Sequence, residues 1–210
     1  MLRNTILATS ALALLSLPAV ADSDEWTVDS AHTSARFSVK HMMISNVNGD
    51  FAKVGGSVKY DGKSLDKATI NATIDANSVD TRDENRDKHL KSADFFDTAK
   101  YPTITFKSTK IEPGKDGFKI YGDLTMHGVT KNVVLNAEPL SPVIKAHGGL
   151  HVGTSATTKI NRKEFGLNFN KTLDNGGAMV GDDVNITLDV ELKQAAPEKT
   201  GEAKAKSDKS

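Results

Sequence analysis

Alternation of apolar and polar residues dominates this chain. In VNITLDVEL (184–192), every second residue from Val184 to Leu192 is apolar, and each residue between them is polar. This is the period of a β-strand with one dry face and one wet face. The same pattern recurs in ARFSV (35–39), ATINATI (68–74), TITFKS (103–108) and GFKIYGDLTM (117–126). We therefore expect seven or eight strands.

Short clusters of turn residues separate these runs. NVNGD (46–50), YDGKS (60–64), EPGKDG (112–117) and DNGGA (174–178) are rich in the Gly, Asn and Asp residues that reverse a chain. Strands joined by short turns pair antiparallel, so the predicted fold class is all-β. Such a chain forms a sandwich or a closed barrel, and composition alone does not choose between these architectures.

One segment has the composition of a helix. We expect DTRDENRDKHLKSADFF (80–96) to be helical over about residues 80–92, with Asp80 or Thr81 as its N-cap. Acidic residues in its first turn and basic residues near its end suit the helix dipole. Its apolar side chains gather at its C-terminal end. The pattern predicts a mostly solvated helix that lies with one end across the sheet.

A tight turn is expected at His127 and Gly128, within GDLTMHGVTKNVVL (122–135). With these two residues at the centre, apolar residues before the turn face apolar residues after it, as Ile120 faces Leu135. Histidine tolerates a positive φ better than most residues with a side chain. We therefore interpret His127 as a turn residue in solvent rather than as a catalytic or metal-binding group.

Lys131 interrupts this match, because it faces Leu124 on the apolar side of the hairpin. A lysine at the rim of a barrel extends its ammonium group into water while its stem covers apolar surface. Alternatively, the same group supplies a cation at the mouth of a cavity, ready for an anionic head group. The sequence leaves both interpretations open.

The ends of the chain differ from its middle. Residues 1–21 predict a signal peptide, with a charged start, a short apolar run and a small-residue cleavage site after Ala21. We therefore expect a periplasmic or secreted protein without stable membrane insertion, whose folded domain covers 22–194. The charged segment 195–210 lacks large apolar residues, which predicts a disordered tail. The chain has no cysteine, so we expect the core alone to stabilise the domain.

The ionisable residues argue against several functions. The 27 basic and 27 acidic residues cancel, so no net field attracts a nucleic acid. The six histidines include His147 and His151 in HGGLH, but they lack the compact spacing of a zinc site, and we expect neither a metal nor a cofactor. No GxSxG motif accompanies the abundant Ser, His and Asp. RDENRDKH (82–89) is either a solvated helix face with mixed ion pairs or a portal whose cations meet a phosphate head.

Five motifs, taken in order, resemble one family. They are WTVDSAHTSARFSVKHM (26–42), SVDTRDENRDKHLKSADFFDTAKYPTITFKS (78–108), GDLTMHGVTK (122–131), INRKEFGL (160–167) and VGDDVNITLDVEL (180–192). Together they are similar to the YceI-like family of exported bacterial proteins over residues 26–193. The resemblance implies an eight-stranded antiparallel, lipocalin-like barrel with one helical segment, and it makes a homodimer an expectation.

The resemblance also implies a long apolar cavity that binds isoprenoid quinone-like or polyprenyl phosphate chains, or fatty acid amides in some relatives. Inward-facing apolar residues of this chain would form its wall, and two basic residues would meet a head group. Buried pairing with an acid is the structural alternative for Arg162. The candidate ligand-binding residues are Phe37, Val39, Ile70, Phe96, Phe106, Phe118, Ile120, Leu124, Lys131, Leu135, Arg162, Phe165, Ile186 and Leu188.

These observations lead to one expected function and two alternatives. We expect non-catalytic binding of an amphiphilic chain lipid, which the protein sequesters or transports. The first alternative is a hydrolase or isomerase acting on a lipid in the same cavity, with Arg162 or His89 as a polar participant. The second is a stress-induced periplasmic interaction protein whose cavity its own side chains fill.

Overall fold

The computed structural model describes residues 25–61, 65–174 and 176–195 of the 210-residue chain. The predicted signal peptide and the predicted tail lie outside these residues, except for Ala195, which ends the last strand. The strands are β1 Glu25–Val28, β2 Ser34–His41, β3 Ser45–Phe51, β4 Val54–Lys59, β5 Thr69–Asp75, β6 Val79–Asp80, β7 Thr103–Gly114, β8 Gly117–Met126, β9 Val129–Ala137, β10 Ile144–Ala146, β11 Gly149–Asn161 and β12 Val180–Ala195. The helices in the described part of the chain are α1 Glu84–Lys91 and the short 3₁₀ helices η1 Leu65–Lys67, η2 Ala76–Ser78 and η3 Arg162–Phe165.

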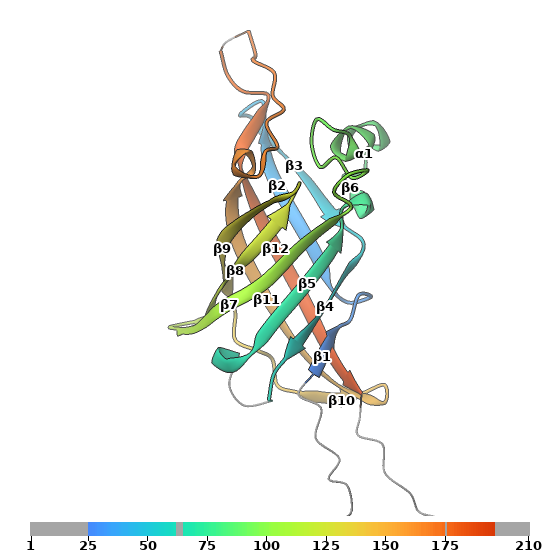
Figure 1. Cartoon of the computed structure of the whole chain (residues 1–210), viewed down its shortest axis with the longest axis vertical. Helices are drawn as coiled ribbons and strands as arrows, with labels where there is room; N and C mark the ends of the chain where they lie inside the picture. The colour runs from blue at the N-terminus through green and yellow to red at the C-terminus, as the bar shows by residue number, and fades with distance from the viewer. Residues whose placement is uncertain (1–24, 62–64, 175, 196–210) are drawn as a thin grey trace, which may run out of the picture.

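Eight strands close into an antiparallel barrel, which confirms the predicted fold class (Figure 1). Hydrogen-bonded neighbours run β11-β9-β8-β7-β5-β4-β1-β12, and β12 pairs again with β11. Outside this ring, β2 pairs with β12, β3 pairs with β2, and β6 pairs with β3. These three strands extend the wall of the barrel beside β12. Closure removes the exposed edges that an open sheet or sandwich would keep.

The β8–β9 hairpin has the predicted register. Ile120 pairs with Leu135, Met126 pairs with Val129, and the turn lies at His127 and Gly128. Both turn residues adopt a positive φ, 52° at His127 and 74° at Gly128. Two such residues in succession match the right-handed twist of the strands that they join.

The turn predicted at NVNGD (46–50) is wrong, because this segment lies inside β3. Gly49 pairs with Phe37 of β2, and a Cβ atom at Gly49 would lie only 2.4 Å from the Phe37 ring. The glycine therefore serves close packing rather than chain reversal. The chain reverses earlier, at Met42 and Met43.

Helix α1 is shorter than predicted and has a different N-cap. It begins after Asp83, whose carboxylate accepts hydrogen bonds from the backbone N–H groups of Asn85 and Arg86, both at 3.0 Å. Thr81, predicted as a possible cap, is buried and hydrogen-bonds through its Oγ1 with Asp87. The backbone of Asp80 belongs to β6 and is thus unable to begin the helix.

The two ends of the barrel are built differently (Figure 1). At one end, Trp26, Val58, Val152 and Leu192 form a buried apolar cluster. At the other end lie α1 and the segment that leads from η3 into β12. Within the described residues, no helix combines the length and the apolar character that crossing a bilayer requires.

Candidate functional site

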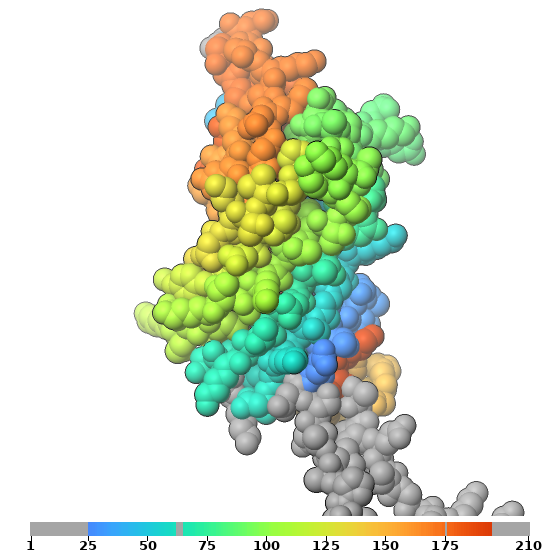
Figure 2. Space-filling view, in the orientation of Figure 1, coloured from blue at the N-terminus to red at the C-terminus, as the bar shows by residue number. Residues whose placement is uncertain are grey.

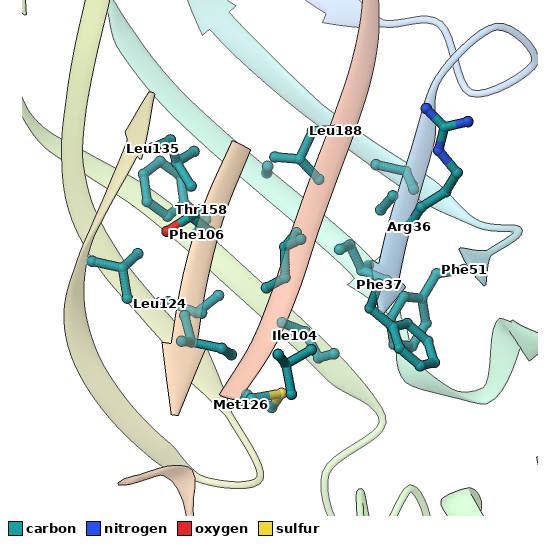
Figure 3. A pocket seen from close by; sticks show the side chains of 18 of the residues that line it. Arg36, Phe37, Phe51, Ile104, Phe106, Leu124, Met126, Leu135, Thr158 and Leu188 are labelled. Atoms are coloured by element: carbon teal, nitrogen blue, oxygen red, sulfur yellow. The ribbon is translucent and has the colours of Figure 1, made fainter. Parts of the chain in front are cut away.

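A cavity of about 500 Å³ lies inside the barrel. Its lining is mostly aliphatic and aromatic, and it draws side chains from all eight strands of the ring, from β2 and β3, and from α1. Figure 3 shows Leu124, Leu135 and Leu188 pointing toward a shared interior. This volume falls within the range of small-molecule sites, roughly 300–1,000 Å³. The alternation of the strands therefore encloses a space that the side chains do not fill.

Most of the candidate ligand-binding residues lie on the wall of this cavity. Their strands place them there because each second side chain of a barrel strand faces inward. Binding of a ligand by these residues stays a prediction. The eleven that line the cavity are Phe37, Val39, Ile70, Phe96, Phe106, Ile120, Leu124, Leu135, Arg162, Ile186 and Leu188.

The other three candidates lie away from the cavity lining. Phe118 packs into an apolar cluster near the β7–β8 turn, and Phe165 is fully buried in η3. Lys131 pairs with Leu124 as predicted, but its side chain is exposed. The ladder between β9 and β11 covers only the far end of β9, at Asn136 and Ala137, so no β11 partner lies beside Lys131. Its position fits a rim lysine whose ammonium group reaches water.

Several lining residues are not among the candidates that the sequence predicts. Phe51, Met126 and Ile160 lie on strands, and alternation along those strands could have identified them. Leu167 and Phe169 lie in the irregular segment after η3, where no periodic signal exists. Only the folded chain brings such loop residues to the cavity.

Aromatic side chains connect α1 with the rest of the barrel end. The ring of Phe169 lies 4.6 Å from the His89 ring and 5.0 Å from the Phe95 ring. On the other side, Phe96 lies 5.7 Å from Phe51 in an edge-on arrangement. All five residues line the cavity, so α1 and the segment after it form an aromatic cover over this end.

The ionisable side chains in the lining are all basic. They are Arg36, Lys40, His41, Arg86, His89, Arg162 and Lys171, and no acidic residue lines the described cavity. Except for Arg36, they gather at the barrel end that carries α1. This end therefore offers a positive surrounding to a polar or anionic group, while the rest of the wall is apolar.

Several of these basic groups already have partners. Arg36 pairs with Asp189, and Figure 3 shows its guanidinium pointing away from the cavity. Arg86 donates 2.8 Å hydrogen bonds to the hydroxyl and to the carbonyl of Thr81. Lys40 and Lys171 are exposed and form no ion pair within the described part of the chain. The two lysines are thus exposed cations at this end of the barrel.

Arg162 is a structural residue rather than a free cation. Its guanidinium donates to the carbonyl oxygens of Leu167, Phe169, Val180 and Gly181, and it lies 3.5 Å from a carboxylate oxygen of Asp182. Burial lowers the pKa of Arg162 from its ordinary value, and Asp182 opposes that change. This network holds the segment after η3 against the start of β12, which matches the structural alternative considered for Arg162.

His127 is a turn residue, but it is not simply in solvent as predicted. Its Nδ1 atom lies 3.2 Å from the carbonyl oxygen of Phe165, and its ring lies 5.0 Å from that of Tyr101. The hairpin tip folds against η3, which half-buries the ring. These contacts explain the residue without a catalytic role.

One cluster outside the cavity could hold a metal ion. Ligand atoms of Asp29, His151 and Glu191 lie within 4.8 Å of one another. However, His151 Nδ1 is already 2.8 Å from Glu191, and the ammonium of Lys193 lies 3.6 Å from Asp29. We interpret the cluster as an ion-pair network that ties the end of β1 to β11 and β12.

Comparison with known proteins agrees with this architecture. The profile of the YceI-like domain matches residues 26–192. A UPF0312 protein of Vibrio cholerae is 36% identical over 169 residues, which cover 79% of this chain and 89% of that protein. A crystal structure of a Campylobacter jejuni YceI protein superposes with a TM-score of 0.63 at 34% identity, covering 75% of this chain and 90% of the other.

A more distant structure shares the fold. It is a polyisoprenoid binding domain from Saccharophagus degradans, implicated in plant cell wall breakdown, with a TM-score of 0.59 and 18% identity. The superposition covers 82% of this chain and 98% of that domain. The profile match and the identity to the Vibrio protein each span most of the folded chain, and they show that this chain belongs to the YceI-like family.

Proposed function

We propose that this protein binds one amphiphilic chain lipid in the barrel cavity and carries or sequesters it without covalent chemistry. The observation that supports this most is the enclosed apolar cavity of about 500 Å³ with basic groups at one end only. An apolar tail would lie along the wall, and the head group would lie near Lys40 and Lys171. The predicted signal peptide supports action in the periplasm or outside the cell.

Apolar contact alone supplies useful affinity in such a cavity. Each buried methylene contributes about 0.8 kcal/mol, so about ten contribute roughly 8 kcal/mol. That free energy corresponds to a dissociation constant of about 1 μM, before the entropic cost of ordering the lipid chain is subtracted. The basic groups would then set the orientation of the lipid rather than its affinity.

An isoprenoid chain is the first lipid class to test. The Saccharophagus degradans domain is a polyisoprenoid binding domain, and it has the same fold as this chain. A fatty acid amide is the alternative cargo in the same cavity. Both are long apolar chains with one polar end, so either one would meet the same apolar wall and the same basic end.

The enzyme alternative has less support in the structure. Arg162, named for that role, is engaged by backbone carbonyl groups. His89 contacts Asp94 at 2.9 Å and packs against Phe95 and Phe169. Both side chains therefore have structural partners. Conversion of a bound lipid to a product during incubation would contradict the proposal.

Filling the cavity should abolish lipid binding. Leu188→Trp places an indole in the cavity, because Leu188 lies on its wall. Protein purified from a bacterial host should retain a lipid in native mass spectrometry, and the variant should retain at least about tenfold less. Thr187→Trp is the matched control, since Thr187 pairs with Arg36 on the outer face of β12. It should retain lipid as the wild type does.

A second variant separates lost binding from lost folding. Ala72→Leu fills the same cavity from β5, and its circular dichroism should match that of the wild type. Retention of the wild-type amount of lipid by both filled variants would contradict the proposal. So would a wild-type protein that carries no lipid and gains no thermal stability from added polyprenyl phosphate.

A further inference from the structure

The tip of the β2–β3 hairpin exposes three consecutive apolar side chains. Met42, Met43 and Ile44 have exposed fractions of 37%, 60% and 81%. In the described part of the chain, the other large exposed hydrophobic residues are Val143 and Ile144, at 47% and 59%. Single exposed apolar residues are ordinary, but a contiguous group on one projecting turn marks a contact surface. We call Met42, Met43 and Ile44 the apolar tip.

The backbone of the apolar tip suits other residues better. Met42 and Met43 adopt φ values of 51° and 62°, in the left-handed region. Hairpin turns of this kind favour Asn and Gly, which fit the conformation and are polar or small. Two methionines here add backbone strain and expose apolar surface to water. Met43 nevertheless stays 60% exposed, which points to a partner outside the barrel.

The apolar tip is continuous with the basic end of the cavity. The backbone N–H of Met42 donates a 2.8 Å hydrogen bond to the carbonyl of Met179. Met179 and the neighbouring His41 both line the cavity. Figure 1 places the hairpin beside the segment that enters β12, and Figure 2 shows that segment projecting beyond the barrel. Whatever contacts the tip therefore lies next to the cavity end.

The charges around the tip identify the chemistry of the partner. Lys40 precedes the tip, and Lys171 lies in the projecting segment, both exposed and without an ion pair among the described residues. Asp174 is the exposed acid in the same segment. Apolar side chains flanked by lysines are the arrangement that inserts shallowly into an anionic lipid surface.

We propose that the apolar tip docks on an anionic phospholipid bilayer and holds the basic end of the cavity against it. Methionine suits this contact, because its flexible thioether chain adapts to a fluid surface. Docking would let a chain lipid pass between bilayer and cavity with little exposure to water. The transfer step rests on the proposed function, whereas docking itself does not.

Vesicle flotation tests the docking. Wild-type protein should float with vesicles of phosphatidylglycerol and phosphatidylethanolamine, and Met43→Asn with Ile44→Ser should weaken this binding at least about tenfold. The matched control is Val143→Asn with Ile144→Ser, which removes two other exposed apolar residues, at 47% and 59%, and should bind as the wild type does. All three proteins share one N-terminus, so any binding by residues 1–24 is common to them.

Charge provides an independent arm. Lys40→Gln with Lys171→Gln should weaken binding to phosphatidylglycerol vesicles several-fold and leave binding to pure phosphatidylcholine vesicles unchanged. Added salt should narrow the difference between wild type and this variant, because salt screens exposed charges. An equal effect on both vesicle types would overturn the electrostatic part of the proposal.

Two results would overturn the docking. One is equal vesicle binding by the wild type and the tip variant, including no binding by either. The other is a wild type that is a dimer in light scattering and a tip variant that is a monomer without vesicle binding, because the apolar tip would then hold two copies together rather than contact the bilayer. A failure of docking with lipid still retained in the cavity leaves the proposed function standing. Vesicle binding by a protein that retains no lipid would show instead that the proposed function fails and that docking stands.

Discussion

At the scale of single residues, burial and partners decided roles that residue type left open. Arg162 and Lys131 are both basic residues with polar neighbours in the sequence, and both are candidates for a head group. The structure buries Arg162 to 4% exposure among carbonyl oxygens and leaves Lys131 in solvent. Neither outcome is visible in residue type, because each depends on which segment covers the side chain.

Removing the guanidinium of Arg162 should destabilise the fold strongly. Arg162→Met keeps the length of the side chain but removes the donor to the carbonyl oxygens of Leu167, Phe169 and Gly181, whereas Val180 still accepts from Asn170. We expect the free energy of unfolding in urea to fall by about 3 kcal/mol or more. Lys163→Met is the control, since Lys163 forms only an exposed pair with Asp182 and should change it by about 0.5 kcal/mol or less. Equal effects would contradict the buried network.

Gly128 should tolerate substitution less well than Gly148. Both glycines have a positive φ, 74° and 79°, so a change to Ala adds similar backbone strain of about 1 kcal/mol. A Cβ atom at Gly128 would lie 2.5 Å from the Tyr101 ring, whereas nothing lies within 4 Å at Gly148. Gly128→Ala should therefore lose a further 1–3 kcal/mol, roughly, in urea denaturation. Similar losses for the two variants would show that the Tyr101 ring moves aside freely.

At the scale of elements, periodic segments were predicted well and aperiodic ones were not. The β8–β9 register follows from matching faces across one turn, which is a local property. Helix α1 begins later than expected, because several acidic residues compete for the cap and only Asp83 meets the first free N–H groups. The segment containing Phe169 has no period, so its contact with α1 is a purely tertiary result.

Phe169 should hold α1 against the barrel. Phe169→Ala removes the ring that contacts His89 and Phe95, so local opening of α1 becomes easier. In native-state hydrogen exchange, amides of α1 should exchange about tenfold faster, while amides of β11 and β12 stay protected. Asn168→Ala changes the exposed neighbour and should leave α1 unaffected. Uniformly faster exchange across the barrel would instead indicate global destabilisation.

At the scale of the whole molecule, the barrel joins segments that are distant in sequence. β1 pairs with the C-terminal part of β12, and β11 pairs with β12 along most of its length. Closure gives each strand of the eight-strand ring a neighbour on both sides, so the inward faces enclose a cavity. The carrier proposal belongs to this scale, because no single strand defines a binding site.

Acid should destabilise the whole domain. Backbone N–H groups donate to Asp29, Asp75 and Asp83 and lower the pKa of each carboxyl from its ordinary value of 3.8. A group whose pKa is lower in the folded state stabilises above its unfolded pKa, and this contribution is lost as pH falls through the folded pKa. Stability should thus be level above about pH 5 and decrease below about pH 4.

Urea denaturation between about pH 3 and pH 7 measures this dependence. Asp75→Asn should make the decrease at low pH shallower, because the uncharged side chain binds no proton on unfolding. Glu164→Gln, at an exposed residue of η3, is the control and should keep the wild-type dependence. Stability that rises as the pH falls would contradict the assignment of these carboxyl groups.

The sequence by itself determined the fold class, the strand faces and the β8–β9 register, since period-two alternation and turn chemistry act between near neighbours. It also placed eleven of fourteen candidate residues on the cavity wall, because an inward face is a property of one strand. The tertiary structure alone decided that Arg162 is buried, that Phe169 covers the cavity and that Met42 to Ile44 project beside its basic end. Those outcomes depend on which distant segments meet when the barrel closes. Alternation within one strand specifies which side chains face inward, but it does not specify which distant segments that strand contacts.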